Sequence, residues 1–192
     1  MTSDIDSKKE YVEPPWVGQV IQFWFEELTE ADWFARSDVI DKRIRERFLT
    51  LHQRLVTHGG CNVTGPRPIL AGVIVLDQFS RNLFRDSPSA YSADSIARRL
   101  ARVAIQQSFD IAMTTQERLF LYLPFEHSEE RTDQALAVQL IGSVGNAEWT
   151  RYAIAHKEII DRFGRFPHRN AVLNRLSTAD EIAFMKEPNN SF

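Results

Sequence analysis

The chain has 192 residues, of which 43% are hydrophobic and 26% charged, and these values are typical of a single soluble globular domain. The formal net charge of -3 argues against a nucleic-acid-binding protein, because such proteins usually carry a basic surplus. A single cysteine, Cys61, excludes an intramolecular disulfide and favours a reducing compartment.

Residues 1–13 are polar, charged and without periodicity, which predicts a flexible N-terminal segment. They contain no apolar core of the signal-peptide type. No apolar run in the chain approaches the roughly 18–20 residues that are needed to span a bilayer. We therefore expect a cytoplasmic protein with no membrane partner and no nucleic-acid partner. The sequence leaves homo-oligomerisation open.

Two amphipathic helices are predicted next. Pro14 and Pro15 stand where a helix can begin, because proline is tolerated in the first turn. Apolar residues then recur at steps of three and four, which indicates one helix face: Val17, Val20, Ile21, Trp24, Phe25 and Leu28. Ser37 or Asp38 can cap the second helix, and Gly59-Gly60 ends it. Its apolar stripe is Ile40, Ile44, Phe48, Leu51 and Leu55.

The segment Ile69–Asn82 is predicted to be the central element of the fold. Its first eight residues are almost all apolar, whereas the next six include Asp77, Gln78, Arg81 and Asn82. A buried strand is the alternative, but Ala71-Gly72 is poor strand material and no other segment reads as a strand that could pair with it. We predict a helix from near Pro68 to Leu83 or Phe84, fully buried at its start.

The C-terminal half contains further helical patterns. We predict helices at about 90–109, from Thr114 or Thr115 to Pro124, where the proline ends or kinks the helix, at about 135–141, and at 149–163, where Gly164 ends the helix. Thr114 with Glu117 has the spacing of a capping box, and Ser177 or Thr178 can cap a final helix. Residues 171–176 are predicted to form one or two helical turns. In the first of these helices, the residues expected to face inward are Ile96, Leu100, Val103 and Ala104.

The fold class that follows is all-α, with about eight helices in antiparallel pairs. Residues 14–187 are predicted to form a single helical domain, and residues 188–192 a frayed C-terminus. No tetratricopeptide consensus occurs in the sequence.

The first polar block follows the central apolar run. Asp77 and Arg81 form an i,i+4 pair, with Gln78 and Asn82 in the neighbouring row and Arg85 beyond. Its functional interpretation is a pocket wall in which Arg81 offers a planar donor fork to a carboxylate or phosphate. The alternative is a solvated helix end with one surface salt bridge, worth under about 1 kcal/mol.

The second polar block, residues 126–129, follows Pro124. A carboxylate beside a histidine, here Glu126 and His127, can support acid–base chemistry. Adjacent residues on a helix do not face each other, so these two would cooperate only if a helix break reorients them. The alternative is a capping loop in which Glu126 or Ser128 accepts hydrogen bonds from free backbone donors.

The third polar block, residues 156–170, combines a helix end with a loop rich in hydrogen-bond donors. Such a loop is a candidate anion site. Alternatively, its arginines bond helix carbonyls while Phe166 and Pro167 fill the core. The candidate ligand-binding residues are His156, Arg165, His168, Arg169 and Asn170.

No metal site is predicted, because the five histidines show neither HxxxH nor HExxH spacing. A site built from Glu126, His127, His156 and His168 would require the fold to assemble it. No phosphate-loop or nucleophile-elbow pattern occurs, and we predict no cofactor.

Three segments carry a family resemblance: LDQFSRNLFRDSPSAY (76–91), FLYLPFEHSE (120–129) and HKEIIDRFGRFPHRN (156–170). They resemble the signature blocks of a bacterial family of uncharacterised proteins, domain-of-unknown-function family 924, and the resemblance extends from about Val17 to Met185. It implies an all-helical fold similar to the right-handed tetratricopeptide-repeat superhelix, and it implies no known activity. Ser80 stands where proline is common in the family, which would leave this helix straighter, and Asn174 stands where glycine is common.

Two functional hypotheses follow, together with a structural alternative. In the first, blocks 77–85, 126–129 and 156–170 form one polar pocket that binds an anionic small molecule or peptide. In the second, the protein is a small hydrolase-like enzyme with His127 or His156 as base and Asp77 or Glu126 as orienting carboxylate. Arg81 or Arg169 would then stabilise charge. In the structural alternative, the blocks are internal clamps between helices.

Overall fold

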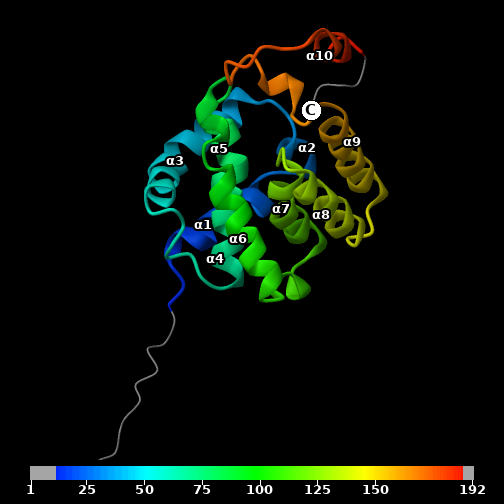
Figure 1. Cartoon of the computed structure of the whole chain (residues 1–192). Coiled ribbons are helices and arrows are strands. Elements are labelled where there is room, and N and C mark those ends of the chain that lie inside the picture. Colours follow the sequence, from blue (N-terminus) through cyan, green and yellow to red (C-terminus); the bar gives the residue numbers. More distant parts are fainter. Residues whose placement is uncertain (1–11, 188–192) are drawn as a thin grey trace, which may run out of the picture.

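The computed structural model describes residues 12–187, which form helices joined by turns and loops, with no strand among them (Figure 1). The all-α prediction is confirmed. Segments η1 and η2 are π-helical turns, and η3 to η5 are 3-10 turns. The elements in chain order are α1 (Pro15–Gln22), η1 (Phe23–Glu27), α2 (Glu30–Trp33), α3 (Asp38–Thr57), α4 (Pro66–Val73), η2 (Ile74–Phe79), α5 (Ser80–Leu83), η3 (Pro88–Tyr91), α6 (Asp94–Gln106), η4 (Phe109–Ala112), α7 (Thr115–Glu126), α8 (Arg131–Gly142), α9 (Ala147–Phe163), η5 (Pro167–Arg169) and α10 (Ala179–Phe184).

The central element is the continuous helix that α4, η2 and α5 form together. In Figure 1 it runs beside α6 through the middle of the molecule, with α1 and α3 on one side and α7, α8 and α9 on the other. Helix α8 packs against both α7 and α9, so consecutive helices are neighbours here, as short connections require. A superhelical stack of the tetratricopeptide-repeat type stays a prediction.

The main core lies where η1 and η2 face each other. Phe79 from η2 packs edge-on against Phe23 and Trp24 from η1, with ring centroids 5.8 and 5.6 Å apart. Trp24 also meets Phe120 of α7 at 5.3 Å. These rings are fully or almost fully buried, and edge-to-face packing adds to their burial energy. The aromatic contacts therefore fix the central helix relative to α1 and α7.

The central helix widens into a π turn at η2, just where its polar residues begin. Ile74–Phe79 departs from regular α geometry, and the expectation that Ser80 leaves this helix straighter than proline would stays a prediction. Side-chain donors bind the carbonyls there: Ser80 donates to Leu76 O at 2.6 Å, and Arg81 donates to Asp77 O at 2.6 Å. Buried His52 supports Ser80 through a 2.7 Å contact between Nε2 and Oγ. π turns of this kind are frequent at functional sites.

Pro124 was expected to end or kink helix α7, and the helix does not end there. It continues to Glu126, and His127 is its C-cap. Proline removes one N–H from the ladder, but the ladder resumes beyond it, because His127 N donates to Leu123 O at 2.9 Å. The predicted capping box of Thr114 and Glu117 is confirmed, as is that of Thr178 and Glu181 at α10.

Other local predictions were wrong. The α6 helix begins at Asp94 rather than near residue 90, because η3 intervenes, and Val103 is 39% exposed rather than inward-facing. The short helix α2 was not predicted. Residues 171–174 form hydrogen-bonded turns, in which Leu173 N donates to Arg169 O and Asn174 N to Ala171 O, but no regular helix follows. Within these turns Asn174 has a φ of 55°, a left-handed conformation that asparagine tolerates better than most residues and that glycine adopts freely.

The flexible N-terminal segment and the frayed C-terminus, predicted at 1–13 and 188–192, fall almost wholly outside the described residues. None of the helices within residues 12–187 combines the length and apolar character that crossing a bilayer requires.

Candidate functional site

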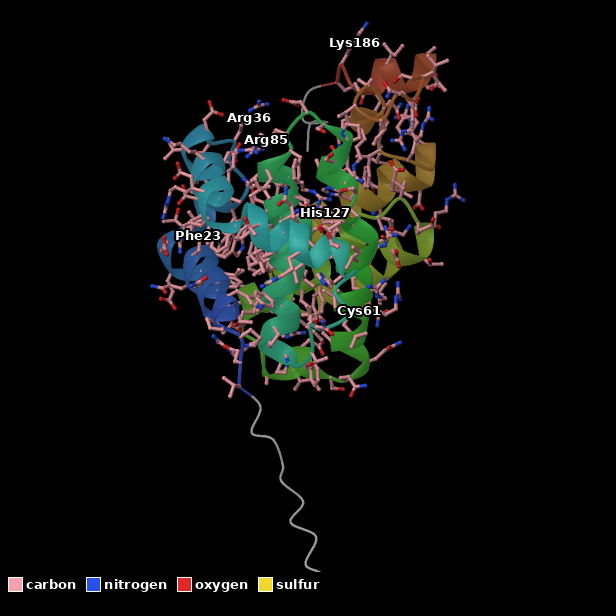
Figure 2. The ribbon with its side chains drawn as sticks, turned by 90° about the vertical axis from the view of Figure 1, so that its left-hand side faces the viewer. Phe23, Arg36, Cys61, Arg85, His127 and Lys186 are labelled. Atoms are coloured by element: carbon pink, nitrogen blue, oxygen red, sulfur yellow. The ribbon has the colours of Figure 1, made fainter. Side chains whose placement is uncertain are left out.

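The three polar blocks meet at one place, although they lie far apart in the sequence. His127, which follows α7, has its Nδ1 2.9 Å from both carboxylate oxygens of Asp77 in η2. Arg169 at the end of η5 donates from Nη1 to the carbonyl of His127 at 3.0 Å. In Figure 2 His127 lies toward the middle of the molecule, with Arg36 and Arg85 nearer its upper edge. His127 thus joins the first block to the third.

Asp77 is a buried carboxylate that orients His127. Its side chain is fully buried, which opposes ionisation, but Arg81 and His127 outweigh burial and hold the pKa of Asp77 below its usual range. Because an ionised carboxylate only accepts hydrogen bonds, Nδ1 of His127 carries the hydrogen and Nε2 keeps a lone pair. No hydrogen bond joins Nε2 to another group within residues 12–187. Burial lowers the pKa of His127, which favours this neutral form.

The guanidinium of Arg81 is already occupied by protein groups. Its Nη1 and Nη2 bind the two carboxylate oxygens of Asp94 at 3.1 and 3.2 Å, and Nη1 lies 3.2 Å from Asp77 Oδ1. The donor fork that the sequence suggested for a ligand is therefore engaged by Asp94, the first residue of α6. Arg81 serves chiefly to neutralise two buried carboxylates.

Glu126 and His156 form a second buried pair. His156 Nδ1 lies 3.2 Å from Glu126 Oε1, and it also bonds the carbonyl of Tyr152 at 2.9 Å. Burial, reinforced by Asp77, raises the pKa of Glu126 to about 8, while burial lowers the pKa of His156 to about 3. At neutral pH the pair therefore consists of a protonated carboxyl and a neutral imidazole. Glu126 and His127 therefore do not pair with each other, because Glu126 contacts His156 and His127 contacts Asp77.

Arg169 is a buried cation with incomplete compensation. Only 6% of its surface is exposed, and its Nε has no hydrogen-bond partner within the described chain. Asp94 Oδ2 is 3.9 Å from its Nη1, beyond hydrogen-bond distance. The guanidinium stacks over Tyr91 and Phe166, 4.6 and 4.4 Å from their ring centroids. Burial and the neighbouring Arg81 lower the pKa of Arg169 to about 10.

Two hollows adjoin at this cluster and share four lining residues, Arg81, Arg85, His127 and His156. The larger, here called the cleft, has a volume of about 700 Å³. The smaller, here called the basic chamber, has a volume of about 400 Å³. Beyond the shared residues, the basic chamber is lined by Arg36, Asp86, Ala90, Tyr91, His168, Arg169 and Val172. The apolar walls of the cleft come from Trp33, Phe34, Leu119, Leu123, Trp149 and Tyr152.

The sequence pattern of a bacterial protein family of unknown function, DUF924, matches residues 20–189 of this chain. The chain belongs to the DUF924 family. The fold is also similar to a solved structure, a protein of unknown function, ATU0120 from Agrobacterium tumefaciens. The two share 32% sequence identity with a TM-score of 0.84, and the match covers 88% of this chain and 96% of the other. No functionally curated protein matches the chain.

In this DUF924 protein the predicted site residues separate into three groups. Eight of them line the cleft or the basic chamber: Gln78, Arg81, Asn82, Glu126, His127, His156, His168 and Arg169. Asp77 lies behind the wall and supports it. Arg165 and Asn170 are not brought to either hollow. Arg165 pairs with Glu181 at 2.7 Å, and Asn170 bonds Arg175 at 2.9 Å and Ser177 at 3.1 Å.

Several residues of the site were missed by sequence reasoning. Trp33 and Trp149 read as ordinary helix or connecting residues, yet both line the cleft. Arg36 lies in an unremarkable loop, and Asp94, the partner of Arg81, lies 13 residues further along the chain. No spacing rule connects these positions, so the sequence carried no signal for them. No group of three or more histidine, cysteine or acidic side chains within residues 12–187 is arranged to hold a metal ion.

Proposed function

We propose that the protein binds an anionic small molecule in the basic chamber. The single observation that carries this proposal is the buried guanidinium of Arg169, with its Nε unpartnered within the described chain and its nearest acidic contact beyond hydrogen-bond distance. Burying a charge without a close counter-charge is costly, and an anion in the chamber would remove that cost. Arginine suits this role because its planar fork matches carboxylate and phosphate oxygens.

The other side chains of the basic chamber support the same ligand charge. Arg36, Arg81, Arg85 and Arg169 line it, whereas Asp86 is its one acidic lining residue within residues 12–187. Asp86 is highly exposed and lies 3.3 Å from Arg36, so it offers little compensation to the interior. Arg81 donates hydrogen bonds to Asp94, and Arg85 donates hydrogen bonds to Asp41, which fixes both guanidinium groups in place. An entering anion would therefore meet positioned cations.

The test is calorimetric titration with inorganic phosphate and with acetate at constant ionic strength. We expect wild type to bind at least one of them, and Arg169→Met to bind at least tenfold more weakly. A ligand at 100 times its dissociation constant adds about 2.7 kcal/mol of stability, so thermal denaturation provides an independent readout. Arg54→Met, an exposed position of α3 that lines neither hollow, is the matched control and should bind like wild type. Equal affinity in wild type and a folded Arg169→Met protein would refute the proposal.

A second comparison separates ligand binding from a purely structural clamp. Arg175, in the segment that follows η5, binds both oxygens of Glu129 at 2.7 and 2.9 Å, which is a complete ion pair. Arg175→Met should lower the free energy of unfolding by roughly 1.5–3 kcal/mol, the usual range for a charged hydrogen bond. Arg169→Met should cost clearly less without ligand, because Arg169 has no carboxylate at hydrogen-bond distance and its removal leaves no acidic group unpaired. Equal losses in urea denaturation would favour the clamp.

A second candidate function, acid–base catalysis, is favoured by the geometry around His127. Asp77 orients a neutral imidazole whose Nε2 has no protein partner in the described chain. The preceding residue, Glu126, has a pKa of about 8 and is protonated at neutral pH. One group can accept a proton and the other can donate one at neutral pH. A screen with small carboxylic and phosphate esters tests this. Turnover that survives both His127→Gln and Glu126→Gln would exclude it.

A further inference from the structure

The cleft continues the basic chamber and differs from it in chemistry. The two hollows share Arg81, Arg85, His127 and His156, so a molecule seated against these residues reaches into both. The lining that belongs to the cleft alone is rich in aromatic and leucine side chains from α2, α7 and α9. A ligand site normally combines such apolar walls with a few placed polar groups.

The aromatic walls of the cleft are of two kinds. Trp33 is rigid, because its Nε1 donates to the carbonyl of Trp24 at 2.8 Å and its ring meets Phe120 edge-on at 4.9 Å. Phe34 and Tyr152 are instead 63% and 43% exposed at the cleft. Large aromatic side chains left open beside a fixed indole form an apolar surface that the fold itself does not cover. Such surfaces commonly mark binding sites.

The aromatic side carries two exposed acidic residues, whereas Asp86, the acidic residue that lines the basic chamber, is paired with Arg36. Glu30 and Glu148 line the cleft and are absent from the lining of the basic chamber. Both are exposed, and each lies in the same helix as one of the tryptophans, Trp33 in α2 and Trp149 in α9. The basic chamber is therefore cationic, whereas the part of the cleft beyond the shared arginines is weakly acidic. A second anionic group on the far end of a ligand would be repelled there.

We infer that the ligand is a small organic molecule with one anionic group, carboxylate or phosphate, in the basic chamber and a flat aromatic body in the cleft. This inference rests on the proposed function and adds the body of the ligand to it. Each hollow, at about 700 and 400 Å³, falls within the roughly 300–1,000 Å³ that pockets for drug-sized ligands have. Arg81 and Arg85 would lie where the anionic group of the ligand, its head, joins the aromatic body.

The experiment is a matched ligand series titrated calorimetrically into the full-length protein. Acetate and inorganic phosphate supply the head alone, phenylacetate and phenyl phosphate supply head and ring, benzyl alcohol supplies the ring alone, and 1,4-phenylenediacetate carries a second carboxylate. We expect the ring-bearing monoanions to bind at least tenfold more tightly than their heads. We expect the alcohol to bind weakly and the dianion to bind more weakly than phenylacetate. Whether carboxylate or phosphate binds more tightly identifies the head.

Variants then separate the two parts of the site. Tyr152→Ala and Phe34→Ala should remove most of the gain from the ring and leave acetate and phosphate affinity unchanged. Ile154→Ala is the matched control, since Ile154 is 41% exposed on the same helix as Tyr152 and does not line the cleft. Glu148→Gln should strengthen binding of the dianion. These results would support the inference.

Other outcomes would overturn it. Binding of the heads with no gain from the ring refutes the aromatic subsite but leaves the proposed anion site standing. Absence of binding by every anion in the series refutes both. A tetrapeptide that ends in phenylalanine and binds more tightly than phenylacetate would assign the site to a peptide carboxyl terminus instead of a small molecule.

Discussion

At the scale of single residues, burial decides the charge state of the acidic groups in the site. Asp77 and Glu126 are both almost inaccessible to solvent, yet their pKa values move in opposite directions. Arg81 and His127 contact Asp77 and favour its ionised form. Burial disfavours the ionised form of Glu126, its partner His156 is a neutral imidazole, and the negative charge of Asp77 disfavours ionisation further. Two carboxylates in one site therefore hold different protonation states at neutral pH.

Glu126→Gln tests this assignment through the pH dependence of stability. The folded-state pKa of Glu126 is about 8, above the ordinary glutamate value of 4.5, so this group stabilises the fold below pH 4.5. That contribution is lost as pH rises through 8. Glutamine resembles the protonated carboxyl at every pH, so the variant should gain stability relative to wild type between pH 5 and pH 8. The gain should approach a few kcal/mol, since one pKa unit corresponds to about 1.4 kcal/mol.

The measurement is urea denaturation at pH 5, 6.5 and 8. Glu148→Gln is the control, because this carboxylate is exposed at the cleft and should show no such trend. A difference between Glu126→Gln and wild type that stays constant across this pH range would contradict a raised pKa for Glu126.

At the scale of elements, helix α7 begins at a capping box and ends at two residues of the site. Its N-terminal capping box pairs Thr114 Oγ1 with the amide of Glu117 at 3.3 Å, and Glu117 Oε2 with the amide of Thr114 at 2.8 Å. Its last residue is Glu126, and its C-cap is His127. The helix that the cap begins therefore carries two site residues at its other end.

Thr114→Ala removes the capping hydroxyl and should lower the free energy of unfolding by about 1 kcal/mol, within the usual range of 0.5–2 kcal/mol for such caps. Thr115→Ala, at the next exposed position and outside the capping box, should have a much smaller effect. Chemical denaturation of both variants measures the difference. Equal losses from the two substitutions would mean that the capping hydrogen bond contributes nothing at Thr114.

The central helix contains a π turn that the periodicity of its sequence did not predict. An apolar run followed by polar residues predicted a regular helix through Asp77, whereas η2 is a π turn. Periodicity reports which residues face the core, but all six residues of η2 are buried, so this segment has no period from which its geometry could be read. Contacts from distant segments meet the helix there: His52 bonds Ser80, and Phe79 packs against η1.

At the scale of the whole molecule, polar contacts between distant segments hold the site together. Arg81 of α5 binds Asp94 at the start of α6, His127 joins α7 to η2, and Arg169 joins η5 to the end of α7. Arg81 is the most connected of these, because it compensates two buried carboxylates, Asp77 and Asp94. Its removal would leave both without their principal counter-charge.

Arg81→Met should therefore destabilise the fold by about 3–5 kcal/mol, the cost of breaking a buried ion pair from one side. Adding Asp94→Asn to this variant should recover part of the loss, because it removes one uncompensated charge. Denaturation of the single and double variants, with Arg54→Met as the exposed control, measures both effects. A loss in Arg81→Met no greater than in the control would show that Asp77 and Asp94 are compensated by other groups.

The sequence by itself determined the all-α class, most helix positions, the caps at Thr114 and Thr178 and the three polar blocks, since these depend on residues within about four positions of each other. Only the tertiary structure decided which polar side chains have partners. Arg165 and Asn170 looked as available as Arg169, yet Glu181 and Arg175 engage the first two, and Arg169 alone of the three lines a hollow. The physical reason is range: burial and electrostatic compensation at one atom depend on groups that chain folding brings from distant segments.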